Sequence, residues 1–230
     1  DPTPYIALAG IRKAYRTGSE RIAIFSGLDL AIPRGDFVAV MGPSGSGKST
    51  LLNMLAGIDR PDAGTLRIGT SHLDQMGEAA RSSWRAHNMG IVFQFYNLLP
   101  MLTAAENVEL PLLLMPLSRQ ERRLRVERAL GLVGLAGRER QYPALMSGGQ
   151  QQRIGIARAL VTDPGLLLCD EPTGDLDRKS ADEVLDMLRF LNRELGKTIV
   201  MVTHDPQAAL YARRTLHLDK GDFIEEKRAA

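Results

Sequence analysis

The fold is decided by one stretch, Gly42-Pro43-Ser44-Gly45-Ser46-Gly47-Lys48-Ser49-Thr50. It fits the pattern G-x-x-x-x-G-K-[ST], which is typical of a loop that binds the phosphates of a nucleotide. Glycines let the backbone N–H groups approach the phosphates closely. Lys48 can place its charge on the β- and γ-phosphates, and the Ser49 hydroxyl can bind Mg²⁺. The residues that we expect to contact the nucleotide are Gly42, Ser44, Gly45, Gly47, Lys48, Ser49 and Thr50.

The segments on either side are those that a phosphate-binding loop requires, a buried strand before it and a helix after it. Residues 37–41 form a continuous apolar run of strand length. Residues 50–56 carry apolar side chains at helical spacing, and Gly57 is a typical helix end. The loop therefore meets a helix N-terminus, whose dipole and free N–H groups favour a bound anion.

The composition predicts an ordinary globular protein. The chain has 230 residues, enough for one large domain, and its net charge of +2 is too small to indicate a nucleic-acid partner. No apolar segment is long enough to span a membrane, and the N-terminal residues lack a signal-peptide pattern. We therefore expect a cytoplasmic protein. The single cysteine, Cys169, lies in an apolar run, which favours a buried side chain over a reactive thiol.

Strand and helix patterns alternate along most of the chain. Apolar or alternating runs predict strands at residues 28–32, 37–41, 64–68, 90–93, 166–169 and 198–202, and a terminal hairpin at 215–218 and 223–225. Capping and periodicity predict helices at residues 50–56, 103–107, 118–133, 147–161 and 180–195. Buried strands that alternate with helices imply a largely parallel sheet, into which the central helices are inserted.

Two acidic residues end one of the apolar strands. Asp170 and Glu171 follow residues 166–169, and ligands of parallel sheets bind at the carboxyl ends of the strands. Asp170 fits the acidic residue that supports Mg²⁺, and Glu171 is then free to accept a proton from an attacking water. Since adjacent side chains on a strand point to opposite faces, the two need not share a role.

A second glycine-rich segment, Ser147-Gly148-Gly149-Gln150, also opens a predicted helix. It repeats the anion-binding chemistry of a helix N-terminus with a free hydroxyl. Because one triphosphate site already exists, this segment is either a simple helix cap or a contact to the nucleotide of another subunit. The second alternative points to a dimer.

Together the motifs resemble the nucleotide-binding domain of ABC transporters, over essentially the whole chain. Residues 42–50 match the Walker A loop, and residues 166–170 match the Walker B strand, which Glu171 follows. The run Ser147-Gly148-Gly149-Gln150-Gln151-Gln152-Arg153 resembles the signature motif of that family. Met146 and Cys169 stand where the family usually has leucine and a small aliphatic residue, which are apolar exchanges of tolerable volume.

The resemblance also assigns residues whose own patterns are uninformative. Gln94 matches the Q-loop glutamine, with a catalytic role and a contact to Mg²⁺, and His204 matches the switch histidine at the γ-phosphate. Residues 174–177 match the D-loop, which brings Asp177 to the nucleotide. Alone, Gln94 would be an ordinary surface glutamine and His204 a strand-end histidine. Asp177 could equally cap the following helix, and both interpretations stay open.

Tyr15 lies where the family places an aromatic ring that stacks on adenine. Tyr5 and Phe25 offer alternative rings nearby in the sequence. The assignment of Tyr15 therefore depends on the resemblance and not on its own pattern.

The resemblance implies an α/β fold. We expect a P-loop NTPase (RecA-like) core with a mainly parallel sheet, an antiparallel β-subdomain and an inserted α-helical subdomain. Residues 1–230 would form one ABC ATPase domain, with residues 1–95 and 160–230 in the catalytic core and about residues 96–159 in the helical subdomain. Two copies would sandwich two ATP molecules, each held by the Walker A loop of one copy and by Ser147, Gly148 and Gly149 of the other. Lys48, Glu171 and His204 would then support ATP hydrolysis with Mg²⁺.

Within the family, three segments look most like the ATPases of bacterial lipoprotein release and macrolide export, with the cell-division ATPase as a near relative. These are residues 51–61, 93–100 and 170–177. The likeness implies a homodimer at the cytoplasmic face of the inner membrane, driving a separate permease that has a large periplasmic domain. The apolar residues 95–100 would either line the groove for a coupling helix of the permease or form a subdomain hinge.

Proteins with three other functions carry most of these motifs. One is the ATPase of an importer for amino acids or other small solutes. Another is a regulatory ATPase that gates a cell-wall hydrolase. The third is a soluble ABC protein acting on DNA or ribosomes, which we expect least, since the chain carries neither a second nucleotide domain nor a long coiled coil.

Overall fold

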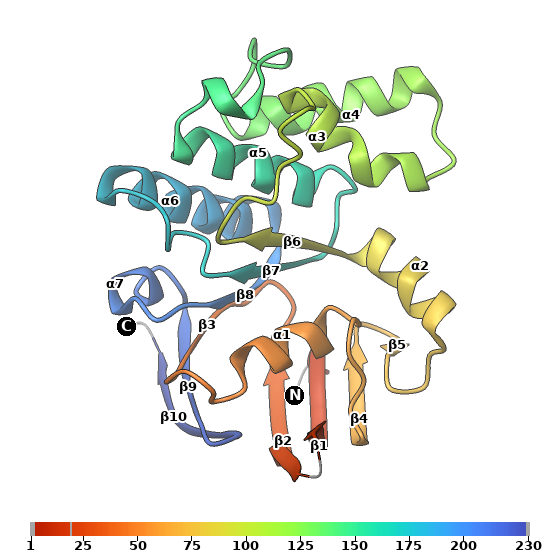
Figure 1. Cartoon of the computed structure of the whole chain (residues 1–230), viewed down its shortest axis with the longest axis vertical. Coiled ribbons are helices and arrows are strands. Elements are labelled where there is room, and N and C mark those ends of the chain that lie inside the picture. Colours follow the sequence, from red (N-terminus) through yellow and green to blue (C-terminus); the bar gives the residue numbers. More distant parts are fainter. Residues whose placement is uncertain (1–2, 19, 229–230) are drawn as a thin grey trace.

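The computed structural model describes residues 3–18 and 20–228, and for residues 225–228 the backbone alone. Within these residues the strands form two sheets (Figure 1). The larger sheet has the order β10-β9-β3-β8-β7-β6. Its members are β3 (Phe37–Met41), β6 (Met89–Phe93), β7 (Leu166–Asp170), β8 (Thr198–Val202), β9 (Arg214–Asp219) and β10 (Asp222–Arg228). All neighbours are parallel except β9 and β10, which confirms the predicted largely parallel sheet and its terminal hairpin.

The parallel sheet is covered on both faces. Along β7, Leu166 and Leu168 pack into one apolar cluster, while Leu167 and Cys169 pack into the other. Strands of this kind have no solvent-facing side, which is why their sequences are continuous apolar runs. Cys169 is fully buried, as the sequence predicted, and burial raises the pKa of its thiol above the usual value.

The register of the parallel sheet aligns the carboxyl ends of its central strands. Phe93 pairs with Asp170, Asp170 with Val202, and Val202 with Val40. The segments that follow β6, β7, β8 and β3 therefore leave the sheet at one edge. This alignment brings together residues that lie far apart in the sequence.

The smaller sheet is antiparallel, with the order β2-β1-β4-β5. Its strands are β1 (Ile6–Thr17), β2 (Glu20–Ile32), β4 (Ala63–Ile68) and β5 (Ser71–His72). The predicted strands at residues 28–32 and 64–68 are confirmed within it, and so is the expected antiparallel β-subdomain. The sequence interpretation did not identify β1 or β5 as strands.

The helices lie on both faces of the parallel sheet. In Figure 1, α3, α4 and α5 gather above the parallel sheet, while α1 lies between that sheet and the antiparallel one. The α-helices are α1 (Lys48–Leu55), α2 (Glu78–Asn88), α3 (Ala104–Glu109), α4 (Arg119–Leu132), α5 (Gly148–Leu160), α6 (Arg178–Leu195) and α7 (Pro206–Ala209), with 3₁₀ helices at Leu110–Leu114 and Pro143–Leu145. None of the helices described combines the length and apolar character that crossing a bilayer requires.

The predicted helix starts are largely confirmed. Thr103 and Ser118 each accept a hydrogen bond from the backbone three residues on and complete a capping box with Glu106 and Glu121. The last long helix begins two residues earlier than predicted, at Arg178, because Asp177 caps it through the backbone N–H of Ser180. Helix α2 was not predicted at all.

Candidate functional site

The phosphate loop joins β3 to α1, as its pattern predicts. Gly47, at the N-cap of α1, has φ +107, a conformation that side-chain-bearing residues rarely adopt, and no side chain caps the helix. Gly42 passes so close to β9 that a Cβ would lie 2.1 Å from the Leu218 carbonyl oxygen. The helix therefore begins with backbone N–H groups that no side chain accepts, the arrangement that an anion can complete.

The Lys48 side chain folds back over its own loop. Its Nζ donates hydrogen bonds of 2.7 Å to the Gly42 carbonyl and 2.8 Å to the Pro43 carbonyl. Ser49, the next residue, is exposed, so its hydroxyl is accessible from solvent. The Ser46 hydroxyl is buried and has no hydrogen-bond partner among the described protein atoms.

Asp170 ends β7 and is held near Lys48. Burial raises the pKa of its carboxyl, and the neighbouring charge of Glu171 raises it further, while Lys48 lowers it. Helix α1, which begins at Lys48, packs against β7, so the Walker B strand and the phosphate loop lie together, as the sequence analysis expected. A hydroxyl and a carboxylate are the hard oxygen ligands that Mg²⁺ accepts.

Glu171 does not continue the strand. Its φ is +48, and its N–H donates a 2.9 Å hydrogen bond to the Val202 carbonyl. Because β7 ends at Asp170 and the backbone turns at Glu171, strand alternation does not decide how these two side chains lie. The turn brings the Glu171 side chain over the end of β8 instead.

His204 is the partner of Glu171. Its Nδ1 lies 2.9 Å from Glu171 Oε1, and its backbone N–H donates a 3.2 Å hydrogen bond to Oε2. The imidazole is 72% exposed, whereas the carboxylate is only 16% exposed. An oriented, half-buried carboxylate beside an exposed imidazole is an arrangement suited to handling the proton of a water molecule.

Gln94 follows β6 and lies against the segment after Glu171. A Cβ on Gly174 would come 2.8 Å from Gln94 Nε2, so the two segments touch. Two residues further on, Tyr96 and Asn97 both have positive φ, and Arg158 of α5 donates hydrogen bonds to their carbonyl oxygens at 2.8 and 2.6 Å. Arg158 therefore holds the loop after Gln94 to the helix that Ser147 opens.

Ser147 is the N-cap of α5 and is exposed. Its hydroxyl accepts from the Gln150 backbone N–H, and the Gln150 side chain accepts from the Ser147 N–H at 3.0 Å. The side chains of α5 pack into one apolar cluster and those of α1 into the other, so the two glycine-rich helix starts belong to opposite faces of the parallel sheet. Ser147, Gly148 and Gly149 are thus not brought to residues 42–50 of the same chain.

Asp177 acts as a helix cap. Ser180 donates to it through its backbone N–H at 3.1 Å and through its hydroxyl at 2.7 Å, and these bonds lower the pKa of the Asp177 carboxyl. The capping interpretation is therefore confirmed. A contact of Asp177 to a nucleotide stays a prediction.

Gln152 has a structural role that the sequence interpretation did not assign. Its side chain is fully buried, and Nε2 donates hydrogen bonds to the Phe93 carbonyl at 3.0 Å and the Pro172 carbonyl at 2.5 Å. It thereby ties α5 to the segments that carry Gln94 and Glu171. The sequence held one signal for this role. Gln152 lies on the apolar side of a predicted helix, and a buried amide requires hydrogen-bond partners.

Comparison with known proteins settles the family. The profile of the family described as ABC transporter matches residues 25–174. The chain belongs to the ABC transporter family. It is an ATP-binding protein and an ATPase of that family, with the fold of its cassettes.

Individual relatives resemble the chain over most of its length. The lipoprotein-releasing system ATP-binding protein LolD of Bordetella avium is 44% identical and is covered over 93% of each chain. The macrolide export ATP-binding/permease protein MacB of Marinobacter nauticus is also 44% identical, over 98% of this chain but 35% of its own length. The dimeric post-hydrolysis structure of the ATP-binding cassette MJ0796 bound to ADP and Pi is 40% identical, with a TM-score of 0.87 over 97% of this chain and 98% of that one.

Proposed function

We propose that this ABC ATPase hydrolyses ATP with Mg²⁺ at sites shared between two copies of the chain and so drives a separate membrane permease. The observation that carries the proposal is the aligned edge of the parallel sheet, where Lys48, Asp170, Glu171 and His204 converge. Each of these groups has a distinct task there.

Lys48, Ser49 and Asp170 form the phosphate and metal side of the proposed site. Among the described residues no group of three His, Cys, Asp or Glu side chains could hold a metal ion alone. The Ser49 hydroxyl, the Asp170 carboxylate and the Gln94 amide oxygen fit Mg²⁺ as partial ligands, with phosphate oxygens completing the set. Bound Mg²⁺ would offset phosphate charge, and Lys48 would leave its loop carbonyls for the β- and γ-phosphates.

Glu171 and His204 form the hydrolytic side. Glu171, oriented by His204, would accept the proton of the attacking water. His204, being largely exposed, would contact the γ-phosphate from the other side. Tyr15, whose ring is 38% exposed, would stack on the adenine base.

The other half of each site would come from a second copy. Ser147, Gly148 and Gly149 lie at the start of α5, where Ser147 is exposed, on the face of the sheet opposite to α1, so one chain cannot close its own site. The relative MJ0796 forms dimers, which supports a homodimer here. ATP would favour the closed dimer because it contacts both copies only in that state, and Asp177 would approach the nucleotide at the same interface.

We further propose that residues 1–95 and 160–230 form the catalytic core and about residues 96–159 the helical subdomain. The position of α3, α4 and α5 at one end of the molecule supports this division (Figure 1). As a separate proposal, the chain would act at the cytoplasmic face of the bacterial inner membrane.

The permease would dock beside the loop after Gln94. A groove of about 320 Å³ opens there, and Phe93, Asn97, Pro111 and Arg158 contribute to its lining. Phe95 beside it is 67% exposed, which is more apolar surface than a free loop requires. Phe95→Asp should reduce co-purification with a permease co-expressed from the adjacent reading frame. The control is Leu210→Asp, which changes a side chain that follows α7 and is 73% exposed. If Phe95→Asp retained the permease fully, only the hinge interpretation would remain.

The substrate class follows from the relatives. LolD is named for lipoprotein release and MacB for macrolide export, so we propose export or extraction of a lipoprotein, a macrolide or a similar molecule. The permease would carry a large periplasmic domain that moves mechanically. A neighbouring frame that encoded a small-solute permease with a binding protein would instead point to an importer.

The test of the central proposal is Glu171→Gln, which keeps the side-chain shape but removes the base. ATP hydrolysis should fall by about 10²–10⁴-fold, since positioned general bases contribute that much. ATP binding should persist, and the protein should elute as a dimer with ATP and Mg²⁺. Glu194→Gln, at an exposed residue of α6, is the matched control. Hydrolysis at the wild-type rate in Glu171→Gln would exclude Glu171 as the base.

A further inference from the structure

The side chain of Tyr15 is fixed at its hydroxyl end. Its ring is partly exposed, yet the hydroxyl donates a 2.5 Å hydrogen bond to Asp59 Oδ2. Asp59 lies between α1 and β4, so this bond joins strand β1 to the segment that follows the phosphate-loop helix. Burial and Asp59 raise the pKa of Tyr15. The Asp59 N–H donates a 3.1 Å hydrogen bond to the Asn53 carbonyl of α1, so Tyr15 is tied through Asp59 to the helix that the phosphate loop opens.

Asp59 is itself held from several sides. Its Oδ1 accepts hydrogen bonds from Lys13 Nζ at 2.6 Å and from the Arg60 backbone N–H at 2.7 Å. Burial works to raise the pKa of this carboxyl, but the hydrogen bonds from Lys13, Tyr15 and Arg60 outweigh it and hold the pKa below its ordinary value. Asp59 is therefore an ionised acceptor for the Tyr15 hydroxyl at neutral pH.

Lys13 adds a second constraint on the ring. Its ammonium group also donates to the Arg60 carbonyl at 2.7 Å, and Lys13 is only 8% exposed. Nζ lies 5.0 Å from the centroid of the Tyr15 ring, within the range of a cation–π contact. The cation lies over one face of the ring, so a planar ligand would stack on the other face.

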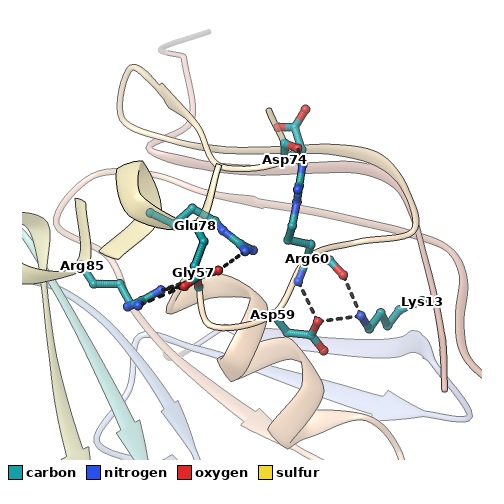
Figure 2. A network of polar contacts seen from close by, with 8 residues as sticks. Lys13, Gly57, Asp59, Arg60, Asp74, Glu78 and Arg85 are labelled. Carbon is teal, nitrogen blue, oxygen red and sulfur yellow. Dashed lines mark hydrogen bonds and ion pairs between the residues drawn. The ribbon is translucent and has the colours of Figure 1, made fainter. Parts of the chain in front are cut away.

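The loop that carries Asp59 is anchored at both ends. Figure 2 shows Arg85 donating to the Gly57 carbonyl, at 2.8 Å, and Arg60 reaching the Asp74 carbonyl, at 2.9 Å. Beyond the view, the Ala14 N–H donates to Asp62 Oδ2 at 2.9 Å. The carboxylate of Asp59 is therefore a fixed point against which the ring is set.

We propose that Asp59 is a positioning residue for the nucleobase, which holds the Tyr15 ring in one orientation beside residues 42–50 with one face open to a stacking purine. The inference rests on the proposed role of Tyr15 as the base platform. A ring that is ordered before the ligand arrives spares the ordering cost on binding, which amounts to about threefold to tenfold in affinity for one side chain. Asp59 acts only through the ring, so the affinity for the phosphates is unaffected.

The test compares a ligand that has a base with one that has none. Tyr15→Phe, Asp59→Ala and the double variant are titrated with Mg²⁺–ATP and with Mg²⁺ and inorganic tripolyphosphate. Each single variant should bind ATP about threefold to tenfold more weakly and tripolyphosphate as well as the wild type does. The double variant should lose no more than either single one, because both break the same contact. Tyr15→Phe keeps the ring and the Lys13–Asp59 pair, so it reports even where Asp59→Ala folds poorly.

Three results would overturn the inference. They are an equal loss of ATP and tripolyphosphate affinity, an unchanged ATP affinity in Tyr15→Phe, and additive losses in the double variant. Tyr15→Ala separates this inference from the proposed function. If Tyr15→Ala leaves ATP affinity unchanged, the base platform itself is wrong. If it weakens ATP binding while Tyr15→Phe does not, only the role of Asp59 is wrong.

Discussion

The two glycine-rich helix starts of this chain look alike in sequence and differ in structure. At α1 the N-cap is Gly47, in a left-handed conformation and without any side-chain acceptor. At α5 the N-cap is Ser147, with φ −65, and its capping box with Gln150 is complete in both directions. The α1 start therefore has no side chain that caps its backbone N–H groups, whereas the α5 start is capped by its own side chains.

This difference indicates which helix start is prepared to bind an anion without a second copy of the chain. The α1 start leaves its first N–H groups to an anion, and the flanking glycines allow close approach. The α5 start needs no ligand to be stable, so it can stand exposed on the surface until a nucleotide is presented to it. We therefore propose that the α1 start binds nucleotide in the single chain, whereas the α5 start contributes only when two copies assemble.

The substitution Ser147→Arg tests the difference between the two helix starts most directly. A bulky cation at the α5 start should block the nucleotide of the other copy and lower kcat about a hundredfold, the typical effect of losing one charge-stabilising donor. ATP binding by the monomer should not change, because residues 42–50 lie on the other face of the sheet.

Ser118→Arg provides the matched control, since Ser118 forms the same capping box on α4. Steady-state ATPase rates and ATP titrations measure both effects. Unchanged turnover in Ser147→Arg would remove the shared site.

A smaller effect is expected from adding a methyl group at each helix start. In Gly47→Ala the Cβ would lie 2.9 Å from the Phe25 ring, at a φ of +107, so stability should fall by about 1–3 kcal/mol. In Gly148→Ala the Cβ would meet the Tyr96 hydroxyl, at the end of a side chain that can move, so stability should change by less than about 1 kcal/mol. Urea unfolding without nucleotide measures both, and equal losses would contradict the comparison.

A still smaller effect is expected from lowering the pH, which should weaken the capping boxes that contain glutamate but not the one that contains Gln150. The hydrogen bonds from Thr103 and Ser118 lower the pKa values of Glu106 and Glu121. Their contribution is therefore complete above the ordinary glutamate value of about 4.3 and is lost as the pH falls through the lowered values. Gln150 does not titrate, so the α5 start should stay intact.

Backbone chemical shifts at the three helix starts, followed from pH 7 to about pH 3, measure this difference. Gln150→Glu should make the α5 start respond like the other two. A response of α5 in the wild-type chain would show that its cap depends on a group other than Gln150.

The sequence predicted those parts of the fold whose signals are local. The buried strands β3, β7 and β8 read as apolar runs, and the caps at Thr103 and Ser118 are recognisable three residues ahead. Helix α2 was missed because only Arg81 and Trp84 are buried along it, which leaves no apolar stripe. Strand β1 was missed because register shifts interrupt its alternation and because the buried Lys13 reads as an exposed residue.

The candidate site was predicted as a set of motifs but not as a set of contacts. Residues at the ends of parallel strands can be grouped from the sequence, since the strands deliver them to one edge. The turn at Glu171, the link from Gln152 to Phe93, and the bond from Tyr15 to Asp59 each depend on backbone geometry or on partners distant in the chain. No spacing rule encodes such pairs, because tertiary packing decides them.

The burial of Cys169 has a practical consequence. The only sulfhydryl of the chain lies inside β7, out of reach of maleimide and spin-label reagents in the folded protein. Site-specific labelling therefore does not require the native cysteine to be replaced first. A cysteine introduced at an exposed position of the antiparallel sheet would carry the sole probe. Distances between the probes of two copies would then follow assembly through the nucleotide cycle.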